Sequence, residues 1–214
     1  MAVSRRDRSA LPTLILQHDR DAPAGLLGDW LAERGEVVVA RMDRGERPPD
    51  PAGFDRLVTL GSERAADDDE VPWQADEQAT LRAADRAGVP ILGVCFGAQS
   101  LARALGGEVR RAARPELGWV TVGTRAPAVV HDGPWLSWHN DELLVPARAA
   151  VLAANESGVQ AYRAGRHIGI QFHPEVTPEI VAGWGAKPEL IAETERRMAE
   201  VRERACALFA ALLR

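Results

Sequence analysis

Cys95 stands between two glycines in the sequence GVCFGAQ, residues 93–99, directly after the apolar run VPIL. The apolar run is typical of a buried strand, and small residues around the cysteine let the backbone turn sharply so that the thiol stands above the sheet edge. A helix beginning after this turn would stabilise a thiolate, and its first N–H groups, above all that of Phe96, would stabilise an oxyanion. The pattern indicates a nucleophile for attack at an acyl carbon, with a buried structural cysteine as the alternative.

A cysteine that attacks an amide needs a general base, and the base needs an orienting partner. Among the five histidines, His173 lies in IGIQFHPEV, where an alternating strand pattern ends and Pro174 keeps the residue before it extended. Residues i and i+2 of an extended segment project to the same side, so Glu175 is placed to accept a hydrogen bond from His173. The plainer interpretation is a structural histidine with a glutamate nearby by chance.

The order and number of these residues argue against two other chemistries. An α/β-hydrolase places its acid between the nucleophile and the histidine, whereas Glu175 follows His173. Cys95 and Cys206 lie far apart, so they have neither the spacing of a metal site nor the number for a disulfide framework. We therefore expect no metal and no cofactor, and we expect Cys206 to pack as a core residue.

The first half of the chain alternates strand-like and helix-like segments, which predicts an open, mostly parallel sheet with helices on both faces. The expected strands cover residues 11–17, 36–42, 54–62 and 89–94, and the expected helices cover residues 23–35, 73–88 and 98–107. Shorter alternating runs at 116–124, 150–157, 159–165 and 167–175 predict hairpins that extend the sheet in antiparallel fashion. Residues 188–213 predict a long helix with one apolar face docked on the sheet.

Length and composition are typical of one globular domain. The chain has 214 residues, 46% of them hydrophobic and 27% charged, with a formal net charge of −5. We expect a disordered basic tail over residues 1–10 and a single domain over residues 11–214. The acidic balance argues against a nucleic-acid partner, and no apolar stretch approaches the ~20 residues that a membrane span needs. With few cysteines and no signal-peptide pattern, the sequence predicts a cytoplasmic protein.

Taken together, the motifs resemble those of the class I, triad-type glutamine amidotransferases. GVCFGAQ and the later HPE at residues 173–175 match that family's nucleophile turn and acid–base pair. VTLGS at 58–62 is similar to the family's oxyanion strand, RPELGW at 114–119 to the loop near its glutamine pocket, and WHNDEL at 138–143 to its HGD segment. The resemblance covers residues 12–185, and it is strongest to free-standing proteins related to the amidotransferase domain of GMP synthase.

Carried over position by position, the resemblance implies that Cys95 is the nucleophile, His173 the acid–base and Glu175 its orienting partner. It implies a flavodoxin-like fold with the cysteine above the carboxyl edge of the sheet. The remaining implied site residues are the oxyanion donors Gly61 and Phe96 and the substrate-binding residues Gln99, Trp138, His139 and Asn140. Two positions depart from the family: Leu60 precedes Gly61 where paired glycines are usual, and Asn140 replaces a glycine.

The resemblance leaves three functions open. The first is hydrolysis of the glutamine γ-amide with ammonia passing to a separate synthetase, since the chain has no GxxxxGK[ST] loop for an ATP-using domain. The second is solo cleavage of a γ-glutamyl amine or peptide. The acidic run at 63–70 would attract a cationic leaving group, although such a run is by default a solvated loop. The third is a silent regulatory homologue, which an intact Cys–His–Glu set argues against.

Overall fold

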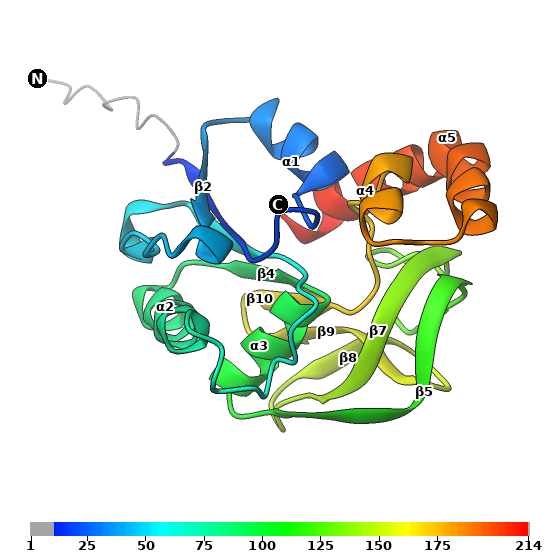
Figure 1. Ribbon diagram of the computed structural model, residues 1–214. Coiled ribbons are helices and arrows are strands. Elements are labelled where there is room, and N and C mark those ends of the chain that lie inside the picture. Colours follow the sequence, from blue (N-terminus) through cyan, green and yellow to red (C-terminus); the bar gives the residue numbers. More distant parts are fainter. Residues whose placement is uncertain (1–10, 214) are drawn as a thin grey trace, which may run out of the picture.

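An eight-stranded sheet forms the centre of the computed structural model, which describes residues 11–213 (Figure 1). Its strand order is β2-β1-β3-β4-β10-β9-β8-β6; neighbours from β2 to β10 are parallel, and β9, β8 and β6 continue antiparallel. The strands are β1 (Thr13–Gln17), β2 (Val37–Arg41), β3 (Arg56–Thr59), β4 (Ile91–Val94), β6 (Gly123–Thr124), β8 (Ala150–Asn155), β9 (Gly158–Ala164) and β10 (His167–Ile170). The predicted mostly parallel sheet with an antiparallel extension is confirmed, and the tail predicted for residues 1–10 lies outside the described residues.

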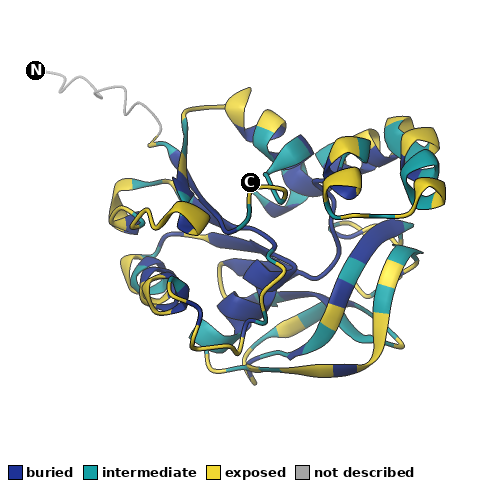
Figure 2. Ribbon diagram, viewed as in Figure 1, coloured by how far each residue is buried: buried dark blue, intermediate teal, exposed yellow. Residues whose placement is uncertain are grey.

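Helices cover both faces of this sheet. α1 (Gly25–Ala32) and α5 (Pro188–Leu212) pack together on one face, and α2 (Gln74–Ala87) and α3 (Phe96–Ala104) pack on the other (Figure 1). Alternate side chains of β1 enter two apolar clusters: Ile15 packs with α1 and α5, whereas Leu14 and Leu16 pack with α2 and α3. Figure 2 shows buried strands between helices whose outer faces are exposed. This layering brings the carboxyl ends of the parallel strands to one edge.

Three shorter helical segments complete the described helices. α4 (Pro178–Gly183) packs against α5, and the 3-10 turns η1 (Met42–Arg44) and η2 (Pro51–Gly53) connect β2 to β3. α4 begins where Thr177 caps it, because the threonine hydroxyl accepts a hydrogen bond from the backbone N–H of Ile180. Between residues 11 and 213 no helix is both long and apolar enough to cross a bilayer.

A second sheet of two antiparallel strands, β5 (Glu108–Val120) and β7 (Trp135–Leu144), stands beside the main one (Figure 1). The prediction that the runs after residue 108 all extend the main sheet is therefore wrong for the residues of β5. The sequence pattern also gave no strand at β7, because His139, Asn140 and Asp141 interrupt its apolar residues. β7 reaches the main sheet through an isolated bridge between Leu136 and His173.

Two glycines permit the turn from β4 into α3. A Cβ at Gly93 would lie 2.5 Å from the carbonyl oxygen of Gly97, and a Cβ at Gly97 would lie 2.1 Å from the carbonyl oxygen of Thr59. Such distances are far shorter than real Cβ contacts, so the backbone of α3 approaches β3 and β4 only because both side chains are absent. The steric requirement explains the glycines that flank Cys95 in the sequence.

We expect Gly97→Ala to destabilise the protein by about 1–3 kcal/mol, because either β3 or α3 must shift to admit the methyl group. This cost exceeds the gain of up to about 1 kcal/mol that removing a helical glycine brings. Urea unfolding measures the difference. The matched control is Gly35→Ala, at an exposed position with no other heavy atom near its Cβ, and equal stability of the two variants would contradict the steric argument.

Candidate active site

Cys95 occupies the turn between β4 and α3 in a backbone conformation that side chains rarely adopt, with φ 52° and ψ −113°. A non-glycine residue in such a conformation costs about 1–3 kcal/mol and persists only where its surroundings hold it. Here the Cys95 N–H donates to the carbonyl of Ile170 at 2.8 Å, and the Gly97 N–H donates to the carbonyl of Leu60 at 3.0 Å. The thiol therefore sits at the N-terminus of α3, 5% exposed, at the carboxyl edge of the sheet.

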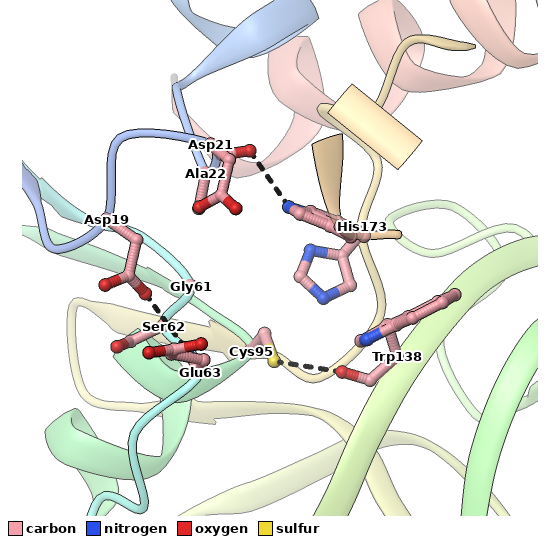
Figure 3. Close-up of a pocket in the computed structure, with 10 residues that line it drawn as sticks. Asp19, Asp21, Ala22, Gly61, Ser62, Glu63, Cys95, Trp138 and His173 are labelled. Carbon is pink, nitrogen blue, oxygen red and sulfur yellow. Dashed lines mark hydrogen bonds between the residues drawn. The ribbon is translucent and has the colours of Figure 1, made fainter. Parts of the chain in front are cut away.

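His173 and Glu175 follow the neighbouring strand β10. The His173 N–H donates to the carbonyl of Leu136 at 2.8 Å, which fixes the backbone beside β7. Its ring nitrogen Nδ1 lies 2.7 Å from Oε1 of Glu175, and both side chains are buried. Figure 3 shows the ring extending over Cys95. Its second nitrogen, Nε2, is buried and has no hydrogen-bond partner within residues 11–213, so it is available to a proton or a reacting group.

The surroundings of His173 raise its pKa. Burial lowers the pKa because it desolvates the charged imidazolium, but Glu175 and Cys95 raise it by more, and the pKa rises from 6.5 to about 10. The ring therefore carries its proton at neutral pH. The Cys95 sulfur itself lies 3.9 Å from the carbonyl oxygen of Trp138, a long contact for a thiol donor.

Gly61 and Phe96 present the two backbone N–H groups expected to stabilise an oxyanion. Gly61 lies two residues beyond β3 and lines the same cavity as Cys95 and His173. Phe96 begins α3, with its ring turned away from the cavity. Within the described part of the chain, neither N–H has an acceptor on another protein group. Leu60, the departure from paired glycines, buries its side chain in the apolar core, so it does not fill the cavity.

A cavity of about 180 Å³ opens above Cys95, a size suited to a small side-chain amide. Its lining residues are Asp19, Asp21, Ala22, Gly61, Ser62, Glu63, Cys95, Trp138, His173 and Trp184 (Figure 3). Six of these are not among the site residues predicted from the sequence, although Glu63 begins the acidic run at 63–70, and Asp19 and Asp21 follow the first strand, where ligands of such sheets bind. Trp184 follows α4 and carried no sequence signal. No three His, Cys, Asp or Glu side chains in residues 11–213 are grouped as a metal site requires.

The four predicted substrate-binding residues take different positions. Trp138 lines the cavity, whereas Gln99 lies inside the fold and donates to the side chain of Gln171 at 3.1 Å. His139 is buried between the Glu116 carboxylate at 3.0 Å and the Asp141 carbonyl at 2.9 Å. Asn140 is exposed and outside the cavity lining. The geometry thus supports a substrate contact at Trp138 and gives no support at Gln99, His139 or Asn140.

Glu175→Gln should lower the pKa of His173, because it removes the negative charge 2.7 Å from Nδ1. In the wild type the folded pKa lies above the ordinary 6.5, so protonation of His173 stabilises the fold fully below about pH 6.5. This stabilisation is lost as the pH rises toward about 10, and the loss should be smaller in the variant. Histidine NMR titration measures the pKa, and urea unfolding across this range measures the stability.

Glu179→Gln is the matched control for this titration. Glu179 lies on α4 and is exposed, and it is hydrogen-bonded to Thr177 rather than to the histidine. Its replacement removes the same charge from the same region and should leave the midpoint of His173 unchanged. A His173 midpoint shared by the wild type and Glu175→Gln would contradict the role assigned to Glu175.

Comparisons of this sequence and structure with known proteins agree on one family. The sequence model of the family described as glutamine amidotransferase class-I matches residues 67–181, which include Cys95, His173 and Glu175. The glutamine amidotransferase-like protein YfeJ of Salmonella typhimurium is 30% identical over 199 residues, covering 86% of this chain and 81% of that protein. GMP synthase (glutamine-hydrolyzing) of Edwardsiella ictaluri is 33% identical over 126 residues, covering 50% of this chain and only 24% of its own length.

A solved structure agrees over almost the whole fold. The crystal structure of a glutamine amidotransferase from Methylobacillus flagellatus has a TM-score of 0.88, with 28% identity, and the match covers 96% of this chain and 95% of that one. The family model covers more than half of the chain, and the match to YfeJ covers most of both proteins. The chain therefore belongs to the class-I glutamine amidotransferase family.

Proposed function

We propose that this protein hydrolyses the γ-amide of glutamine through a γ-glutamyl thioester on Cys95 and releases ammonia. One observation carries the proposal: a cysteine held at the N-terminus of α3 shares a cavity with a histidine whose Nδ1 is 2.7 Å from Glu175. The chain's membership of its family supports a reaction that takes the amide group of glutamine. The positions of the Cys95, His173 and Glu175 side chains support the individual steps of this reaction.

The acylation half begins with the Cys95 thiolate and the His173 imidazolium. The sulfur attacks the γ-carbonyl carbon, and the carbonyl electrons move to oxygen, which the N–H groups of Gly61 and Phe96 stabilise. One such donor is worth about 3 kcal/mol in comparable enzymes. His173 gives its proton to the amide nitrogen, the C–N bond breaks, ammonia leaves, and the γ-glutamyl group remains on the sulfur.

The deacylation half uses the same residues in reverse. The neutral imidazole of His173 takes a proton from water as the water oxygen attacks the thioester carbon. The second oxyanion forms at the same N–H groups. The C–S bond then breaks, glutamate leaves, and the thiolate and imidazolium are restored. Glu175 accepts the Nδ1 hydrogen bond throughout, which keeps Nε2 directed at the sulfur and the substrate.

The destination of the ammonia belongs to the same proposal. The chain matches about a quarter of the length of the Edwardsiella ictaluri GMP synthase, whose name describes a glutamine-hydrolysing synthase. An enzyme with this name joins glutamine hydrolysis to a synthesis, which supports an acceptor for the ammonia that the present site would release. We therefore propose a separate ammonia-accepting synthetase as the partner.

Cys95→Ala should reduce glutamine hydrolysis by about 10⁴-fold or more, because no other group can form the thioester. Ammonia release measures turnover, and mass spectrometry of acid-quenched protein detects a γ-glutamyl adduct on the peptide that carries Cys95. Cys206→Ala is the matched control, since Cys206 lies on α5 outside the cavity lining and should keep full activity. Residual turnover by Cys95→Ala equal to that of the control would refute the mechanism.

An acidic rim favours a second candidate substrate, the γ-glutamyl amide of a cationic amine. Asp19, Asp21 and Glu63 line the cavity, whereas no lysine or arginine of residues 11–213 does so (Figure 3). The Asp19 carboxylate accepts from the Glu63 N–H at 2.9 Å, which fixes the acidic loop beside the site. The Arg64 guanidinium lies 3.8 Å from the Glu63 carboxylate, and both side chains are exposed. This arginine therefore offsets only part of the negative charge around the cavity. A positive leaving amine would meet complementary charge here.

We expect the wild type to cleave the γ-glutamyl amide of a linear diamine with a higher kcat/KM than the neutral alkylamide of equal length. Asp21→Asn and Glu63→Gln should each lower this preference about 2- to 5-fold, the range expected of a partly exposed charge pair. Glu70→Gln is the matched control, because Glu70 is an exposed acid of the same loop outside the cavity lining. Equal kcat/KM for the charged and neutral amides would remove this candidate.

A further inference from the structure

A buried histidine–glutamate pair that the proposed mechanism does not use lies at the edge of the sheet that carries Cys95. Nε2 of His18 is 3.0 Å from Oε2 of Glu77, a contact without hydrogen-bond geometry, and both side chains are fully shielded from solvent. His18 follows β1 and Glu77 lies in the first turn of α2. Neither residue lines the cavity, so neither is placed to touch a substrate.

The pair is too costly to be an incidental feature of the core. A buried carboxylate and imidazole lose hydration that a single contact rarely restores, and replacing such pairs by apolar residues is often neutral or stabilising. The better explanation is that the pair holds neighbouring segments of the chain in one arrangement, and its contacts show which segments these are. Both partners make specific contacts toward the proposed oxyanion donors.

Glu77 holds the strand that leads to Gly61. Its second oxygen, Oε1, accepts a hydrogen bond from the Thr59 hydroxyl at 2.6 Å, and Thr59 is the last residue of β3. Gly61, one of the two proposed oxyanion donors, is only two residues further on. The side chain of Thr59 is completely buried, so this hydrogen bond has no competition from water.

His18 holds the other donor. Its ring centroid lies 5.0 Å from that of Phe96 and 4.7 Å from that of Trp73, and the Phe96 and Trp73 rings are 5.4 Å apart. These three rings therefore form one packed group beneath the start of α3. The Phe96 side chain fixes the residue whose backbone N–H is the second proposed donor.

We propose that His18 and Glu77 form a positioning pair for the oxyanion hole. The pair links the end of β3 to the start of α3, so that the N–H groups of Gly61 and Phe96 face one oxygen atom at the same time. This inference rests on the proposed thioester mechanism, because only an acyl-transfer reaction forms the oxyanion that these groups would stabilise.

Two reactions of Cys95 separate positioning of the hole from general damage to the site. Glutamine hydrolysis forms an oxyanion, whereas alkylation by iodoacetamide forms an S–C bond as iodide leaves, with no oxyanion. We expect Glu77→Gln and Thr59→Val to lower kcat for glutamine about 10- to 100-fold, part of what loss of a whole oxyanion donor costs. The KM and the rate of Cys95 alkylation should change less than about 2-fold in both variants, because neither residue lines the cavity.

Matched variants complete this experiment. Thr59→Ser keeps the hydroxyl that Glu77 accepts from and should restore most of the kcat lost in Thr59→Val. Asp76→Asn removes a charge from the same turn of α2 at an exposed side chain and should leave both reactions at the wild-type rate. Thermal unfolding of each variant verifies that the comparison is made on folded protein, and Thr59→Val tests the inference even where Glu77→Gln fails to fold.

Three results would overturn the inference. Wild-type kcat in Glu77→Gln and Thr59→Val would show that the hole does not depend on the pair. Equal losses of hydrolysis and of alkylation would show that the pair supports the nucleophile or the fold rather than the hole. A wild-type protein that turns over neither glutamine nor a γ-glutamyl amide would overturn the proposed function and this inference together, whereas the first two results leave the proposed function intact.

Discussion

The close approach of α3 to the strands beneath it is the constraint on which the site depends. The glycines at 93 and 97 remove the side chains that would collide with backbone atoms, and Cys95 then turns with a positive φ that only its fixed neighbours sustain. Backbone hydrogen bonds tie this turn to Ile170 on one side and to Leu60 on the other. The Cys95 sulfur, the His173 ring after β10 and the Gly61 N–H after β3 therefore leave the sheet at one edge.

Buried polar groups at this edge occur in pairs. His173 with Glu175 and His18 with Glu77 flank the turn, and each pair is nearly or fully shielded from solvent. Because a polar group buried without a partner costs free energy, the glutamate beside each histidine helps the edge to hold that histidine. The two pairs differ in what they face. Within residues 11–213, His173 keeps Nε2 without a hydrogen-bond partner beside the cavity, whereas both ring nitrogens of His18 lack such a partner inside the protein, where Glu77 also accepts from Thr59.

Local sequence signals predicted the turn at Cys95 and the contact of His173 with Glu175 better than they predicted the surroundings of the cavity. Steric arguments predicted the sharp turn that the glycines around Cys95 permit. The i, i+2 spacing predicted the contact between the histidine and the glutamate of the HPE segment. The alternation of strand-like and helix-like segments predicted the parallel half of the sheet. Gln99 and His139 carried the expected polar groups, but their orientation depends on distant partners, Gln171 and Glu116, that no local pattern reveals. The strand β7 was missed because polar residues interrupt its apolar ones.

The walls of the cavity come from β7 and from the segment after α4, neither of which the sequence pattern predicted. Trp184, after α4, lies with its ring centroid 4.7 Å from that of His173, and its Nε1–H donates to the Asp21 carbonyl at 3.0 Å. Trp138, on β7, contacts Trp184 from the other side, with centroids 5.9 Å apart. The Trp184 indole covers the His173 ring, which is buried, and the low local dielectric strengthens the electrostatic coupling of this ring to Glu175 and Cys95. The parallel strands thus position Cys95 and His173, while the two-stranded sheet and the segment after α4 supply Trp138 and Trp184, which line the cavity beside them.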